Sequence, residues 1–174
     1  MRSVRKPEGS DRMDRAANLN LEKCTMVIQF GQSTDIDNWM NLVKEISWNF
    51  PGLETNERIA EHRKIVLQFI GKAQALCAKD DNEKIIGVIL FSRGRNMICC
   101  LGVSPKHRRY GVASCLLSKA LEQLDRTKDI SVSTFREDDK KGTAPRALYK
   151  KFGFVEDELV EEFGYPNQVF LLHP

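Results

Sequence analysis

One stretch decides the fold: residues 101–117, which read LGVSPKHRRYGVASCLL. It begins as the end of an apolar strand, is interrupted by Pro105, and continues through a basic loop into an amphipathic helix. The apolar residues of that helix recur at i, i+3, i+4, i+7, i+8 and i+11, starting from Ala113. They are Ala113, Leu116, Leu117, Ala120, Leu121 and Leu124. The pattern therefore predicts a strand, a loop and a helix in direct succession.

The loop of this stretch has the character of an anion site. The first turn of a helix leaves backbone N–H groups unpaired at the positive end of the helix dipole, which favours phosphate. Gly111 and Ala113 are small enough to let an extended anion lie against the backbone, and Lys106, Arg108 and Arg109 add positive charge. The segment is neither a P-loop nor a dinucleotide fingerprint, because it lacks the Gly-Lys-Ser/Thr ending of the one and the third glycine of the other.

Strands and helices alternate along the rest of the chain. Strands are predicted at 24–30, 74–79, 84–91, 97–103 and 130–135, with two more after residue 155, joined around residues 164–167. Helices are predicted at 35–49, from the N-cap Thr55 to about Ile70, and at 146–152 with Pro145 at its first position and Gly153 as its cap. Hairpins combined with helical crossovers predict an α/β (α+β) fold with a mixed sheet and helices on both faces.

Composition and charge exclude several classes of protein. The chain has 27 Lys and Arg against 24 Asp and Glu, and this net charge of +3 is too small to demand nucleic acid or a membrane as a partner. The sequence has no apolar window of membrane-spanning length and no signal peptide, so we expect a cytoplasmic protein. Residues 1–20 are interpreted as a disordered tail, and residues 21–174 as a single domain. The five cysteines and three histidines predict no metal site.

The pattern Arg108-x-x-Gly111-x-Ala113 resembles the cofactor loop of the GNAT superfamily of N-acetyltransferases, Gln/Arg-x-x-Gly-x-Gly/Ala. The lead-in Val103-x-Pro105 is similar to that family as well. Residues 147–154, ALYKKFGF, resemble its second signature, a short helix that ends in Gly-Phe. The resemblance extends from about Cys24 to Leu172 and implies a mostly antiparallel sheet of about seven strands, in which a central parallel pair of strands splays apart.

Acetyl-CoA is the cosubstrate that this resemblance implies. Backbone N–H groups from about Arg109 to Ser114 would hold its pyrophosphate, and the strand end at residues 101–103 would pair with its pantetheine arm like an extra strand. A main-chain N–H of the same strand end would polarise the thioester carbonyl. The implied cofactor-binding residues are Leu101, Gly102, Val103, Arg108, Arg109, Tyr110, Gly111, Val112, Ala113 and Ser114.

Tyr149 occupies the position of the family's general acid, which would protonate the departing CoA thiolate when an amine attacks the thioester directly. No carboxylate stands on the strand 97–103, so the base is left open among Glu54, Glu57, His62, a carboxylate of the C-terminal hairpin, and water. Because many relatives have Asn where Gly142 stands, a non-catalytic acyl-CoA sensor is the alternative function.

Two further features allow a functional and a structural interpretation. Cys99 or Cys100 would be a nucleophile or, as we favour, a packed core residue; adjacent strand residues face opposite sides, so at most one would point at the cofactor. The charged residues 136–142 predict a solvated loop, whereas in the functional interpretation one basic side chain reaches a CoA phosphate. The candidates are Lys140, Lys141 and Arg146.

The resemblance implies the acceptor only as a class, a small-molecule or protein amine, and we expect the protein to be a monomer or homodimer. The first 154 residues carry a charge of +8 and the last twenty carry −5, which favours an acceptor that is cationic before it reacts. Five aromatic residues would either line its cleft or belong to the core. They are Trp39, Trp48, Phe50, Phe163 and Tyr165.

Overall fold

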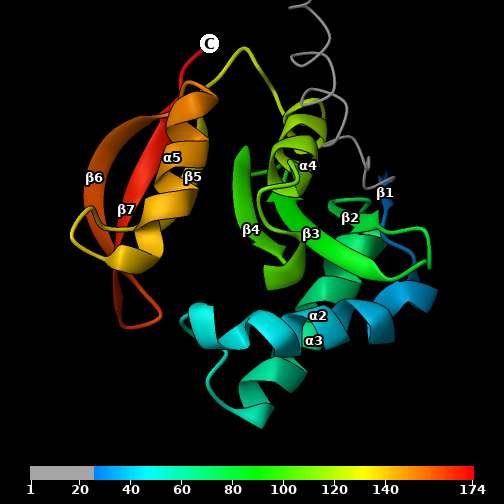
Figure 1. Ribbon diagram of the computed structural model, residues 1–174. Coiled ribbons are helices and arrows are strands. Elements are labelled where there is room, and N and C mark those ends of the chain that lie inside the picture. The colour runs from blue at the N-terminus through cyan, green and yellow to red at the C-terminus, as the bar shows by residue number, and fades with distance from the viewer. Residues whose placement is uncertain (1–25) are drawn as a thin grey trace, which may run out of the picture.

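Seven strands form one mixed sheet in the order β1-β2-β3-β4-β5-β7-β6 (Figure 1). The structure is a computed structural model that describes residues 26–174. The strands are β1 (Val27–Phe30), β2 (Ala75–Lys79), β3 (Ile85–Ser92), β4 (Met97–Val103), β5 (Ile130–Phe135), β6 (Val155–Glu162) and β7 (Tyr165–Leu172). Every neighbouring pair is antiparallel except β4 and β5. The mostly antiparallel sheet that the sequence predicts is therefore confirmed.

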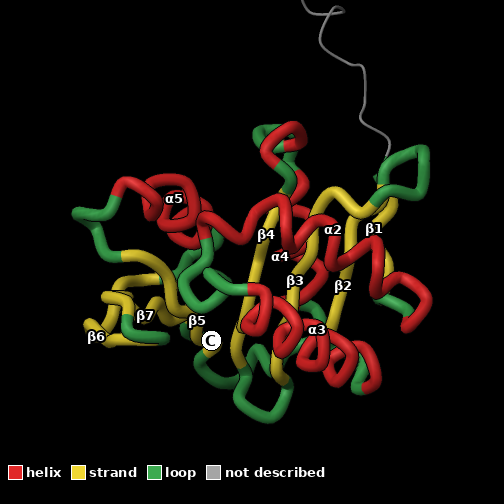
Figure 2. The backbone as a smooth tube through the Cα atoms, turned by 90° about the horizontal axis from the view of Figure 1, so that it is seen from below, coloured by secondary structure: helices red, strands yellow, loops and turns green. Residues whose placement is uncertain are grey.

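Four α-helices of the described chain cover the two faces of this sheet (Figures 1 and 2). They are α2 (Ile36–Ile46), α3 (Asn56–Gly71), α4 (Val112–Leu121) and α5 (Thr143–Lys151), with short 3₁₀ turns η1 (Ser33–Asp35), η2 (Ser47–Asn49), η3 (Pro105–His107) and η4 (Lys140–Gly142). Buried side chains of α2 and α3 pack on one face, and those of α4 and α5 pack on the other. The expectation of helices on both faces is confirmed.

The parallel pair at the centre of the sheet is joined over a very short length. Met97 of β4 pairs with Ser131 of β5, and Ile98 pairs with Val132. Beyond these two positions the strands carry no further pairing in the described part of the chain, and Figure 1 shows the two halves of the sheet separating towards α2. This geometry confirms the predicted splayed pair.

A β-bulge lies at the point where the strands part. Leu90 of β3 pairs with Cys100, but the next pair joins Phe91 to Ile98, so Cys99 is the extra residue of β4. A bulge bends its strand and interrupts the alternation of side chains. We infer that the bend contributes to the divergence of β4 from β5, and it alters the alternation that the sequence predicts at the two cysteines.

Helix α5 begins at Thr143, three residues earlier than predicted, because η4 leads directly into it. Pro145 is therefore the third helical residue rather than the first. A proline is tolerated there because the N–H groups of the first turn have no partner within the helix.

The predicted cap at the end of α5 is confirmed. Gly153 has a φ of +89° and donates its N–H to the carbonyl of Lys150 at 3.0 Å, while the N–H of Phe154 donates to the carbonyl of Tyr149 at 3.0 Å. These two bonds form a Schellman motif, whose usual apolar contact is supplied by the rings of Tyr149 and Phe154, 5.6 Å apart. The cap thus fixes the position of Tyr149.

The C-terminal hairpin turns at Phe163 and Gly164, whose φ values of +54° and +71° are typical of a two-residue turn. Residues 165–167, which the sequence places in the turn, belong instead to β7. Pro166 is accommodated in an interior strand because the pairing of β5 with β7 stops one residue short of it, at Phe135.

The predicted tail, residues 1–20, and residues 24–25 of the first predicted strand lie outside the described residues. Among the residues described, no helix is long and apolar enough to cross a bilayer. Within the same part of the chain, three or more potential metal ligands nowhere gather into a site.

Candidate active site

The loop between β4 and α4 is fixed at its start. Ser104 is buried; its N–H donates to the carbonyl of Ile86 at 2.9 Å, and its hydroxyl donates to the carboxylate of Glu45 at 2.8 Å. At its end, Gly111 is the N-cap of α4 with a φ of +80°, and no side chain caps the helix. The loop is therefore anchored to β3 and α2 while the helix terminus is left open.

The backbone N–H groups of this loop are free to bind a ligand. None from Arg108 to Ser114 donates to an acceptor among the described residues. A Cβ at Gly111 would meet nothing within 4 Å, so the space beside the backbone is open. A Ser or Asp at this N-cap would occupy such N–H groups with its own side chain, whereas glycine leaves them available. The geometry is that of a phosphate site at a helix N-terminus.

Basic side chains surround this site. Lys106, Arg108 and Arg109 are exposed and form no ion pair within the described residues. The guanidinium of Arg108 lies 5.9 Å from the centre of the Trp48 ring. Val112 is 1% exposed, so of this residue only the backbone N–H faces a ligand.

The edge of β4 leads from the loop into the gap between the strands. Leu101 and Val103 are half-buried and pack against the core under α4, and Gly102 is buried. Facing β5, residues 99–103 have no strand partner in the described chain. An unpaired strand edge offers its N–H and C=O groups to an extended ligand.

Tyr149 lies at this gap, on α5. Its side chain is 5% exposed, and its hydroxyl makes no hydrogen bond within the described residues. Burial raises the pKa of Tyr149 well above its ordinary value, and the nearby Cys100 thiol raises it further. A neutral phenol therefore lies near the Cys100 thiol, which belongs to the part of β4 that has no partner in β5.

The two cysteines of β4 do not have the character of nucleophiles. Burial raises the pKa of Cys99 to about 11 and that of Cys100 to about 12. The thiolate is the reactive form of cysteine, and at neutral pH such thiols hold almost none of it. Cys100 is half-buried and packs against the core under α2, which supports the packing interpretation for this residue, whereas Cys99 is exposed and is not a core residue.

A cleft of about 420 Å³ opens between the end of α2 and the C-terminal hairpin. It is lined by Ser47, Trp48, Phe50, Pro51, Leu53, Glu54, Lys141 and Tyr165. Three of the five aromatic residues considered from the sequence thus line it. Trp39 instead is fully buried in the core under α2, and Phe163 lies at the hairpin tip beside Gly52.

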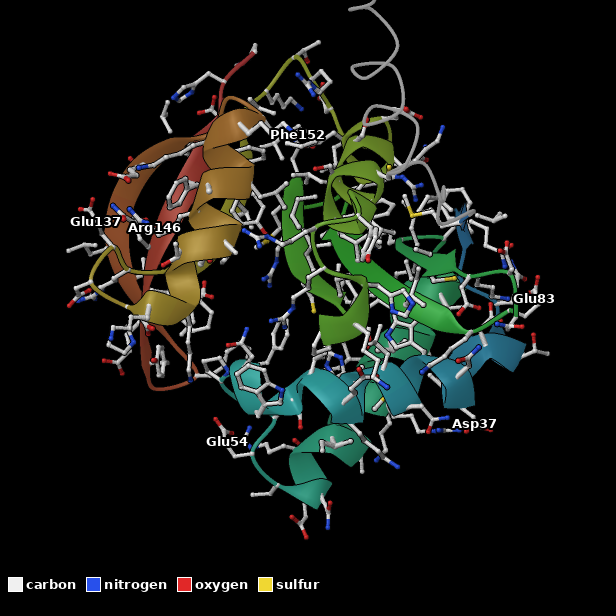
Figure 3. The ribbon with its side chains drawn as sticks, in the orientation of Figure 1. Asp37, Glu54, Glu83, Glu137, Arg146 and Phe152 are labelled. Carbon is white, nitrogen blue, oxygen red and sulfur yellow. The ribbon has the colours of Figure 1, made fainter. Side chains whose placement is uncertain are left out.

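Of the expected base candidates, only Glu54 lines the cleft. Figure 3 shows it on the segment that precedes α3; a backbone N–H two residues earlier donates to its carboxylate at 2.7 Å and lowers the pKa of Glu54. Glu57 and His62 lie on α3 away from the cleft lining, and burial lowers the pKa of His62. On the hairpin, Glu162 accepts the hydroxyl of Ser133 at 2.9 Å.

The charged loop 136–142 is fastened to the hairpin rather than simply solvated. Asp139 accepts the hydroxyl of Tyr165 at 2.5 Å and the backbone N–H of Lys141 at 2.9 Å. The first bond lowers the pKa of Asp139 and raises that of Tyr165. The ammonium of Lys141 lies 5.7 Å from the Tyr165 ring centre, in the cleft. Sequence reasoning missed this cluster, because no local pattern joins residues 139 and 165.

Arg146 belongs to the fold and not to the cofactor site. It is 6% exposed and donates to the carbonyl of Phe135 at 3.1 Å, to Gln168 at 2.8 Å and to Glu156 at 2.5 Å. Its guanidinium also stacks 5.0 Å from the ring centre of Phe170, and Figure 3 shows it on α5 beside β6 and β7. These contacts correct the interpretation of Arg146 as a CoA phosphate ligand.

Comparison with known proteins agrees with this geometry. Residues 71–156 match a family described as "Acetyltransferase (GNAT) domain". An acetyltransferase of the GNAT family from Bacillus cereus superposes with a TM-score of 0.67 at 21% identity, covering 86% of this chain and 97% of that chain. No curated protein sequence matches the chain.

Two further solved structures share the fold. A GNAT superfamily phosphinothricin acetyltransferase from Sinorhizobium meliloti, in complex with AcCoA, gives a TM-score of 0.68 at 17% identity over 85% of this chain and 88% of that one. The ribosomal-protein-S18-alanine N-acetyltransferase from Escherichia coli gives a TM-score of 0.65 at 14% identity, covering 85% of this chain and 93% of that chain.

Proposed function

Because the chain belongs to the GNAT superfamily of acetyltransferases, we propose that it transfers the acetyl group of acetyl-CoA to a primary amine. One observation carries the proposal: the open N–H groups at the start of α4 adjoin the gap where β4 leaves β5. The first suits a diphosphate, and the second suits an extended amide-bearing arm. A molecule that carries both groups, with a thioester at its end, fits the two together.

The chain would hold this cosubstrate largely through its backbone. N–H groups from Arg109 to Ser114 bind the pyrophosphate, and the side chains of Arg108 and Arg109 balance its charge. Residues 101–103 pair with the pantetheine amides at the edge of β4. Support comes from the loop N–H groups and basic side chains, which form no hydrogen bond or ion pair of this kind within the described chain, and from residues 101–103, whose edge towards β5 has no strand partner there.

In the proposed reaction the neutral amine nitrogen attacks the thioester carbonyl carbon, a C–N bond forms, and the C–S bond breaks. A main-chain N–H of residues 101–103 stabilises the negative charge on the carbonyl oxygen. Tyr149 donates its proton to the departing sulfur, and the proton lost by the amine passes to water in the cleft. Burial disfavours a thiolate and a phenolate alike, so the proton moves to the sulfur as the C–S bond breaks, and Tyr149 regains a proton from water afterwards.

The acceptor would enter from the cleft beside Trp48 and Tyr165. Glu54 and the acidic hairpin favour an amine that arrives as a cation. The printed names of similar structures include acetyltransferases for phosphinothricin and for a ribosomal-protein alanine, so both small-molecule and protein amines fit the proposal. We also propose that the protein is cytoplasmic and that it acts as a monomer or a homodimer.

Release of CoA thiol from acetyl-CoA, measured with a panel of amines and with product masses, tests the proposal. We expect amine-dependent release in the wild type and a fall in kcat of about 10²- to 10⁴-fold in Tyr149→Phe. CoA affinity and unfolding should change little, because the lost hydroxyl has no partner among the described residues. Acetyl-CoA binding with no amine-dependent release would instead support the acyl-CoA sensor.

A further inference from the structure

Two side chains of opposite charge line the same cleft and form no salt bridge with any of the described residues. Glu54 lines the cleft from the segment before α3, and Lys141 lines it from η4. Neither forms a salt bridge within the described residues. A backbone N–H lowers the pKa of Glu54, and the Lys141 side chain is exposed. The cleft therefore presents an anion and a cation that form no salt bridge, although Arg58 acts electrostatically on Glu54 and Asp139 acts on Lys141.

The cation is held in place by its neighbours. Asp139 acts on Lys141 electrostatically, but its oxygens accept the Tyr165 hydroxyl and the Lys141 backbone N–H rather than the ammonium. The Lys141 ammonium lies instead over two rings, 5.7 Å from the centre of Tyr165 and 6.0 Å from that of Phe135. Such contacts orient an ammonium without neutralising it. Lys141 thus remains available to an anionic group of a ligand.

Aromatic and aliphatic side chains also line the cleft. Trp48, Phe50 and Tyr165 supply ring faces, and Leu53 and Pro51 supply aliphatic surface. A volume of about 420 Å³ is near the lower end of the range for small-molecule sites, roughly 300–1,000 Å³. The space suits one small organic molecule with an apolar body and a charge at each end.

We propose that the acceptor amine also carries a carboxylate, which Lys141 binds while Glu54 attracts the ammonium. This inference rests on the proposed acetyl transfer and narrows its acceptor to small zwitterions of the amino-acid type. A polyamine would leave Lys141 facing a like charge, and a simple apolar amine would leave it unpaired. The charge pattern thereby selects against both.

Matched acceptors test the proposal: an aromatic amino acid, its carboxamide, and the amine that lacks the carboxyl group, each assayed for acetylation with wild type, Lys141→Met and Lys140→Met. Lys140 is the control, because it is an exposed neighbour that does not line the cleft. The wild type should show a KM for the acid at least about five-fold below that for the amide. Lys141→Met should abolish this preference, and Lys140→Met should retain it.

The outcomes separate this inference from the proposed function. Acetylation of amines without preference for the acid, or with a preference that Lys141→Met keeps, overturns the inference and leaves acetyl transfer standing. If no amine releases thiol, acetyl transfer fails. Calorimetric titration of the acid and its amide into the CoA-loaded protein then decides the inference: tighter, Lys141-dependent binding of the acid supports it, and equal binding refutes it.

Discussion

Replacing Gly87 with alanine should separate α4 from the sheet and weaken both the fold and the phosphate site. Gly87 lies in β3, where a Cβ would come within 2.7 Å of Val112 Cγ1 and 2.9 Å of Leu116 Cδ1. Carbon atoms pack at about 3.5–4.0 Å, so the first turn of α4 must move by roughly 1 Å. Val112 gives little relief, because a β-branched side chain in a helix has one strongly preferred rotamer.

Overpacking of this kind costs about 1–3 kcal/mol, which for a chain of this length corresponds to a melting temperature lower by about 2–12 °C. The same displacement moves the N–H groups of α4 that we assign to the pyrophosphate. Loss of one charge-assisted hydrogen bond, about 1.5–3 kcal/mol, would weaken CoA binding roughly ten-fold or more.

Thermal unfolding and calorimetric titration with CoA measure the two effects. Gly94→Ala is the matched control: it lies in the turn between β3 and β4, its φ is not positive, and a Cβ there meets nothing within 4 Å. We expect the control to be neutral or slightly stabilising, since alanine loses less backbone entropy than glycine on folding. A Gly87→Ala protein as stable as the control would refute the steric reasoning.

Three other predictions follow from the site. Because burial raises the pKa of Tyr149, the phenol keeps its proton to high pH. The value of kcat/KM should therefore rise with pH as the amine deprotonates, and it should not fall again below pH about 10. A fall of kcat/KM with an apparent pKa near 9 would contradict this prediction. Arg146→Met should lower the free energy of unfolding, measured in urea, by about 1–3 kcal/mol and leave the CoA affinity unchanged. The Lys150–Glu156 ion pair, at 2.6 Å, remains in this variant and limits the loss. Weaker CoA binding by a variant of full stability would restore the role of Arg146 as a phosphate ligand. The double variant Cys99→Ala/Cys100→Ala should retain activity, and mass spectrometry of wild type with acetyl-CoA alone should show no acetyl adduct at either thiol.

Short-range patterns carried the prediction of the elements that build the cofactor side. The apolar period from Ala113, the break at Pro105 and the uncapped Gly111 lie within a few residues of one another, and each acts on the backbone beside it. The same holds for the cap at Gly153, which positions Tyr149. Such features are readable in a sequence because helix periodicity and caps depend on neighbours along the chain.

Only the tertiary structure decided which residues line the cleft that we propose for the acceptor. Trp39 and Trp48 stand nine positions apart on one helical segment, yet the first is buried in the core and the second lines the cleft. Arg146 is buried and forms an ion pair with Glu156. Lys141 enters the cleft because Asp139 bonds Tyr165 from the other side of a hairpin. Strand register and helix packing bring these residues together, so the sequence by itself determined the elements that we propose for the acetyl donor, and only the assembled sheet created the cleft that we propose for the acceptor.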